Sequence, residues 1–85
     1  MLKLYQREPC PYCKPVREKL TELNVTYINV NLPKDRALRT ELIEKTGVPY
    51  IPALIDEEDN VIISGKLEYN QHVLDYIEKK FGQNR

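Results

Sequence analysis

Short apolar runs suited to β-strands alternate along this chain with longer segments of helical spacing, and no other feature constrains its fold as much. Residues 2–6 are one strand candidate, and residues 25–30, rich in β-branched and aromatic side chains, are the next. Between them, four apolar residues follow at steps of three, four and three: Cys13, Val16, Leu20 and Leu23. This spacing is one face of a helix that Asn24 is placed to end, so the pattern predicts a β-α-β unit.

A second helix and a hairpin are predicted in the middle of the chain. Pro33 suits the first turn of a helix, and Gly47 suits a position just past its end. Residues 51–55 and 61–63 are strand candidates, joined by an acidic segment at 56–60. Two short strands with such a connection predict a β-hairpin.

A last helix is predicted to begin between Lys66 and Asn70 and to end before Gly82. The element order is then β-α-β-α-β-β-α. We expect one α/β domain over residues 1–85, with a four-stranded mixed sheet and helices on both faces, a plan similar to the thioredoxin-like fold.

Composition excludes several kinds of partner. Thirteen basic and thirteen acidic residues give no net charge, so no overall basic field draws the chain to nucleic acid or to a membrane surface. No apolar stretch has the length of a signal peptide or a membrane-spanning helix. The sequence predicts a cytoplasmic monomer.

The two cysteines lie in Cys10-Pro11-Tyr12-Cys13, at the junction between the first strand and the first helix. A disulfide between them would close a very small loop, which constrains the unfolded chain little. Pro11 suits the first helical position because its missing N–H costs nothing there. We therefore expect Cys10 at the N-cap, and a chemical role for the pair.

The two thiols are expected to differ. At an N-cap, free backbone N–H groups and the helix dipole favour the thiolate form of Cys10, with Arg7 and Lys14 adding positive charge. Cys13 shares the apolar stripe of the helix, so burial disfavours its charged form. Cys10 is the predicted attacking thiolate and Cys13 its resolving partner.

Two other interpretations of the cysteine pair are weaker. A zinc site usually needs four N or S ligands, and His72 is the one further conventional ligand in the sequence. His72 itself is expected to be a solvated surface histidine. An inert pair is the remaining possibility, and no metal is expected.

The segment from Tyr5 to Cys13 resembles the opening of dithiol glutaredoxins, including the basic residue three positions before the first cysteine. Thioredoxins carry a tryptophan before their cysteine pair, and this chain has none. The resemblance continues at residues 46–52, where glutaredoxins have a Thr-Val-Pro segment. It implies a glutathione-dependent thiol–disulfide oxidoreductase that reduces protein disulfides and glutathione mixed disulfides.

The resemblance also implies a glutathione site. Its residues would be Arg7, Tyr12, Ile51, Pro52, Gly65 and Glu68. In the family the proline is cis and faces the attacking cysteine, which assigns that role to Pro52 with Pro49 as the rival. The Ile51 backbone could then pair with glutathione as an added strand segment. An ordinary trans proline on an edge strand is the alternative.

The chain departs from the family pattern before its last helix. Glutaredoxins carry two glycines and one or two aspartates there, whereas this chain has Ser64 for the first glycine and Leu67 for an aspartate, and Glu68 keeps a carboxylate. Residues 51–56 are also similar to the N-terminal domain of glutathione transferases, and in that register Asn70 could cap the last helix.

Two alternative functions stay open, the first because of the altered segment and the second because some members of the family bind a cluster. The chain could be a glutaredoxin-shaped protein that a thioredoxin reductase reduces, or it could bind a [2Fe–2S] cluster as some glutaredoxins do. Expected partners are glutathione and disulfide-containing or glutathionylated proteins, with a reductase as the other electron donor.

Overall fold

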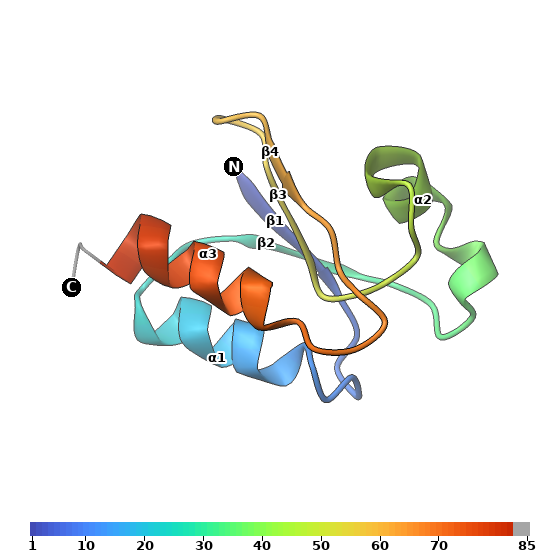
Figure 1. Cartoon of the computed structure of the whole chain (residues 1–85), viewed down its shortest axis with the longest axis horizontal. Coiled ribbons are helices and arrows are strands. Elements are labelled where there is room, and N and C mark those ends of the chain that lie inside the picture. The colour runs from blue at the N-terminus through green and yellow to red at the C-terminus, as the bar shows by residue number, and fades with distance from the viewer. Residues whose placement is uncertain (83–85) are drawn as a thin grey trace.

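The computed structural model describes residues 1–82, and four strands within them form one mixed sheet in the order β2-β1-β3-β4 (Figure 1). Their bounds are β1 Leu2–Gln6, β2 Ile28–Asn31, β3 Ala53–Asp56 and β4 Val61–Ile63. β1 runs parallel to β2 and antiparallel to β3, and β3 pairs antiparallel with β4. The predicted β-α-β unit and the hairpin are both confirmed.

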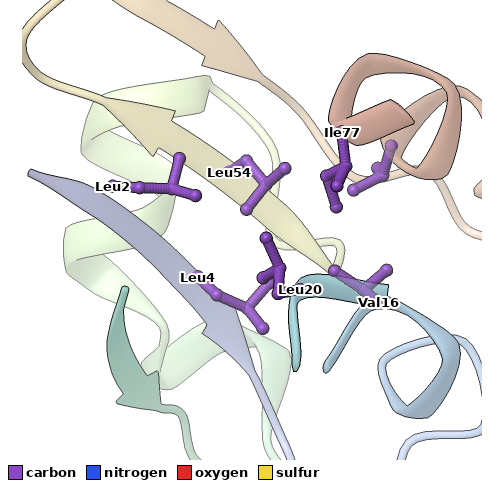
Figure 2. Close-up of a cluster of buried hydrophobic side chains, with 7 residues drawn as sticks. Leu2, Leu4, Val16, Leu20, Leu54 and Ile77 are labelled. Carbon is purple, nitrogen blue, oxygen red and sulfur yellow. The ribbon is translucent and has the colours of Figure 1, made fainter. Parts of the chain in front are cut away.

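Helices cover both faces of the sheet, as predicted (Figure 1). α1 (Lys14–Glu22) and α3 (Gln71–Phe81) lie side by side on one face, and α2 (Thr40–Thr46) lies on the other. Side chains alternate along β1, so Leu2 and Leu4 point to the first face and Tyr5 to the second. Figure 2 shows the labelled side chains of the first core: Leu2, Leu4, Val16, Leu20, Leu54 and Ile77.

The second helix is shorter than predicted, and Pro33 does not begin it. A single 3₁₀ turn, η1 (Arg36–Leu38), forms first, because Asp35 accepts a hydrogen bond of 2.9 Å from the Ala37 N–H. Arg39 then leaves helical geometry with ψ 56°, and α2 starts one residue later. Leu38, the last residue of η1, is 63% exposed. Gly47 ends α2 in the left-handed conformation at φ 86°, as predicted.

The second strand also begins three residues later than predicted. After α1, Asn24 adopts φ 57° and the Val25 N–H donates to the Leu20 carbonyl at 2.9 Å, which closes the helix end with a Schellman-type bond. The chain therefore reaches the sheet only at Ile28, which pairs with Lys3. Within residues 1–82, no helix combines the length and apolar character that crossing a membrane requires.

Candidate active site

Cys10 lies in the loop between β1 and α1, and the predicted N-cap position is wrong. α1 begins at Lys14, so Cys13 is its N-cap residue, and Pro15 rather than Pro11 lies in the first turn. The Cys10 carbonyl accepts hydrogen bonds from the N–H groups of Cys13 at 3.2 Å and Lys14 at 3.4 Å. These bonds close a turn that leads into the helix, which places Cys10 one turn ahead of it.

A polar network holds the loop that leads to Cys10. The buried side chain of Gln6 accepts a hydrogen bond of 2.5 Å from Arg17 and donates one of 2.9 Å to Glu8. Arg17 also forms an ion pair with Glu8 at 3.4 Å and donates to the Arg7 carbonyl at 3.4 Å. Arg17 thereby ties the end of β1 and the first residues of the cysteine loop to α1.

Cys13 is fully buried, whereas Cys10 is partly exposed, and both are free thiols. Cys13 packs with Tyr5, Leu42 and their neighbours in the second core, not with the Val16 and Leu20 of its own helix stripe. Burial raises the pKa of Cys13 to about 12, and hydrogen bonding to Cys10 adds to the increase. Cys13 is therefore a protonated thiol at neutral pH.

A pocket of about 250 Å³ opens beside Cys10. The cysteine loop, the segment after β2, the residues before β3 and the segment before α3 all contribute to it. Its lining residues are Arg7, Pro9, Cys10, Pro11, Tyr12, Arg36, Arg39, Tyr50, Ile51, Lys66 and Leu67. Arg7, Tyr12 and Ile51 from the sequence-based set thus meet at Cys10, although Ile51 is far from the other two along the chain.

The Ile51–Pro52 peptide bond is cis, as expected, and it is the one cis bond among residues 1–82, which leaves the bond before Pro49 trans. Pro52 is fully buried and Ile51 lines the pocket. The β1–β3 ladder begins with the pair Tyr5 and Ala53, so the Ile51 backbone lies just outside it. It is therefore positioned at the pocket without being part of the sheet pairing.

Gly65 lies directly on the proline loop. A Cβ atom there would be 2.4 Å from the Tyr50 carbonyl oxygen and 2.7 Å from the Pro52 carbonyl oxygen. A side chain at this position would require the two backbone segments to move apart. The next two residues, Lys66 and Leu67, line the pocket, whereas Glu68 is exposed and is not part of its lining.

Two side chains at the start of α3 hold the segment around Gly65. Asn70 accepts from the Lys66 N–H at 2.8 Å and donates to the Lys66 carbonyl at 3.1 Å, so its side chain does not cap α3 as expected. His72 Nε2 donates to the Ser64 carbonyl at 2.6 Å. The prediction of a solvated His72 is wrong, because the ring is half-buried and its Nδ1 is fully buried.

Arg36 and Arg39 are pocket residues that sequence analysis missed. Arg39 is 4% exposed, and its guanidinium donates to three carbonyls: Pro33 at 2.9 Å, Pro49 at 2.8 Å and Lys34 at 3.2 Å. Arg36 lies over the Tyr50 ring, with 5.7 Å to its centroid. No local pattern marks these residues, because the contacts that orient them include partners in the segment before β3.

Metal ligands do not gather in the described part of the chain. Among residues 1–82, no three His, Cys, Asp or Glu side chains are placed to hold one ion. The expectation that the chain works without a metal stays a prediction.

The chain belongs to the glutaredoxin family. The family model named Glutaredoxin matches residues 2–59. A relative from Clostridium pasteurianum, an uncharacterised glutaredoxin-like 8.6 kDa protein of the rubredoxin operon, is 33% identical over 66 residues, which are 74% of this chain and 83% of that protein. The family as a whole consists of thiol–disulfide oxidoreductases, and this class fits the two free cysteines, of which Cys10 lines the pocket and Cys13 is buried.

Solved structures confirm the thioredoxin-like fold and the similarity to glutathione transferases. A thioredoxin-like protein superposes with a TM-score of 0.63 at 27% identity, over 86% of this chain and 99% of that one. A glutathione transferase of Phanerochaete chrysosporium, solved with oxidised glutathione, gives a TM-score of 0.78 at 23% identity over 99% of this chain. The chain spans only 38% of that transferase, so the likeness shows the fold alone.

Proposed function

We propose that this chain is a thiol–disulfide oxidoreductase in which Cys10 attacks the substrate disulfide, Cys13 resolves it and glutathione is the reductant. The observation that carries the proposal is the asymmetry of the two thiols. Cys10 is partly exposed at the pocket, and Cys13 is fully buried behind it with a pKa raised to about 12 by burial. Only Cys10 can meet a large substrate.

In the first half of the reaction, the Cys10 thiolate attacks one sulfur of the substrate disulfide. The substrate S–S bond breaks, a Cys10 mixed disulfide forms and the other substrate sulfur leaves as a thiolate that takes a proton from water. Cys13 does not compete at this stage, because it is protonated and has no contact with solvent.

In the second half, Cys13 gives up its proton and attacks the Cys10 sulfur. The mixed disulfide breaks, the second substrate thiol is released and Cys10 and Cys13 are left oxidised as a disulfide. Burial raises the pKa of Cys13 at every stage of the reaction. The negative charge of the Cys10 thiolate also raises it, and this second contribution disappears once the Cys10 sulfur is bonded to substrate. Two glutathione molecules then reduce the pair and leave as glutathione disulfide.

The pocket supports an anionic thiol such as glutathione as the reductant. Four basic residues line it, Arg7, Arg36, Arg39 and Lys66, and guanidinium groups bind carboxylates well. The Ile51 backbone, ahead of the β3 ladder, could pair with the cysteinyl backbone of glutathione. Arg7 and Tyr12 would lie beside the bound tripeptide. The cytoplasmic location stays a prediction.

One observation favours a second candidate, reduction by a thioredoxin reductase. Glutathione carries an ammonium group as well as two carboxylates, and the described lining of the pocket contains no acidic residue to bind it. Glu68, the carboxylate expected for this purpose, lies outside the lining, and Lys66 occupies a place in it. Repulsion between the Lys66 ammonium and the ammonium group of glutathione would weaken glutathione binding.

A parallel turnover assay separates the two reductants. The chain is supplied with one small uncharged disulfide, NADPH, and either glutathione with glutathione reductase or thioredoxin reductase alone. The proposal predicts turnover with glutathione that is abolished by Cys10→Ser. Turnover with thioredoxin reductase alone would favour the second candidate, and turnover with neither would refute both.

A further inference from the structure

A second hollow of about 490 Å³ adjoins the Cys10 pocket. It is lined by Arg7, Lys34, Asp35, Arg36 and Arg39. Three of these, Arg7, Arg36 and Arg39, also line the pocket beside Cys10, so the two hollows share a wall. We call the combined surface the basic groove, defined by Arg7, Lys34, Arg36, Arg39 and Lys66.

Positive charge in the basic groove has no carboxylate partner in the described structure. The ion pairs within residues 1–82 engage the N-terminal amine, Lys3, Arg17, Lys19 and Lys80, and none engages a groove residue. Asp35 is the one acidic residue of the lining, and its Oδ1 already accepts the Ala37 N–H at 2.9 Å. Since the whole chain has no net charge, this excess is local to the groove.

Arg39 places part of that charge where water does not screen it. Arg39 is 4% exposed, and all three hydrogen-bond acceptors of its guanidinium are uncharged carbonyls. Burial lowers its pKa, and the positive charges of Arg7 and Arg36 lower it further. The groove residues therefore repel one another, and a bound anion would relieve that repulsion.

The two adjoining hollows indicate whether the bound anion is a small molecule or part of a longer chain. Cys10, Pro11 and Tyr12 line the first hollow but not the second. A group that fills only the space beside the attacking sulfur therefore leaves the second hollow empty, whereas an extended chain joined to that group can continue into it. Arg36 is already oriented between the two hollows by its contact with Tyr50.

We propose that the basic groove binds acidic side chains of a protein substrate that flank the disulfide cysteine attacked by Cys10. The inference rests on the proposed function and specifies its substrates: proteins in which glutamates or aspartates neighbour the reactive cysteine. Lys34 is a specificity residue in this scheme, because it lines the second hollow and not the pocket beside Cys10.

Binding is measured first, without any redox step. The probes are a fluorescent peptide with a run of glutamates beside a serine that replaces the cysteine, its glutamine counterpart and a single-stranded oligonucleotide of the same charge. Anisotropy at low ionic strength should show binding of the glutamate peptide alone, lost at high salt. Equal binding of the glutamine peptide, or tighter binding of the oligonucleotide, would overturn the proposal.

Turnover then tests specificity. The variant Lys34→Gln, which changes only the second hollow, is compared with Lys45→Gln, which removes the same charge from an exposed position outside the groove. For a protein disulfide flanked by glutamates, kcat/KM should fall about three-fold in the groove variant and stay unchanged in the control. For the same disulfide flanked by glutamines, neither variant should differ from wild type.

The two failures are distinguishable. An equal loss of kcat/KM for both flanking sequences, or an equal loss in the control variant, would overturn the groove proposal. The proposed function would still stand in that case, because the wild-type chain reduces the disulfide. If wild type fails to reduce even a small uncharged disulfide, the proposed function is wrong, and the peptide-binding measurement still decides whether the groove binds acidic segments.

Discussion

Replacing Gly65 by alanine should disturb both the stability of the chain and its active site. The new Cβ would lie 2.4 Å from the Tyr50 carbonyl oxygen and 2.7 Å from that of Pro52. Both obstacles are backbone atoms, which cannot rotate away as a side chain can. The segment before α3 and the proline loop must therefore separate, and with them Lys66 and Ile51, which both line the pocket.

The magnitude follows from the cost of overpacking, typically about 1–3 kcal/mol, with backbone obstacles at the upper end. A loss of about 2–3 kcal/mol in a domain of this size lowers Tm by roughly 10–20 °C. Gly65→Ala should thus remain folded at room temperature but melt early, and its kcat/KM should fall. Urea denaturation followed by circular dichroism gives the free energy of unfolding, and the disulfide turnover assay gives the activity.

Gly47→Ala is the matched control. Gly47 has φ 86°, which costs a residue with a side chain about 1–2 kcal/mol, yet a Cβ added there would meet no atom of a non-neighbouring residue within 4 Å. The substitution should lower stability by a similar amount and leave turnover of the folded protein unchanged. The reasoning fails if Gly65→Ala unfolds with the wild-type free energy, or if both variants lose activity in proportion to stability.

Further predictions concern the thiols and one ion pair. Cys10→Ser should abolish all disulfide reduction, whereas Cys13→Ser should keep deglutathionylation and lose reduction of protein disulfides, with mass spectrometry finding a glutathione adduct on Cys10; activity retained by Cys10→Ser would reverse the assigned roles. Burial raises the pKa of Cys13 to about 12, so iodoacetamide should label it only slowly at neutral pH and about tenfold faster with each added pH unit, and a plateau below about pH 9 would contradict this. Hydrogen bonding to Lys80 lowers the pKa of the buried Asp56 carboxyl. The folded state therefore gains stability from this carboxylate above about pH 4, the usual carboxyl pKa, and loses that stability as the pH falls through the lowered pKa. Asp56→Asn should cost about 1 kcal/mol at neutral pH and nothing in strong acid, as urea denaturation across pH would show, and a constant difference would refute the assignment.

Local patterns predicted much of the fold. The apolar spacing of α1, the capping glycine at Gly47 and the acidic hairpin connection all act over a few residues, so the sequence alone places them correctly. The burial of Cys13 was also predicted, but for a different reason from the one in the structure: Cys13 precedes α1 and packs in the second core, apart from the Val16 and Leu20 stripe. The ends of the segments were harder to predict. Asp35 caps a separate 3₁₀ turn, so α2 does not begin at Pro33, and the hydrogen bonds that close the end of α1 place the start of β2 at Ile28.

The arrangement around Cys10 depended on contacts between distant segments. Sequence patterns report how each element is built, but not which backbone carbonyls it will meet in the folded chain. The Arg39 guanidinium is oriented by the carbonyls of Pro33 and Pro49, and His72 by that of Ser64. The tertiary structure alone therefore decided that the pocket is lined by positive charge, because its basic residues come from separate segments that only folding brings to one cysteine.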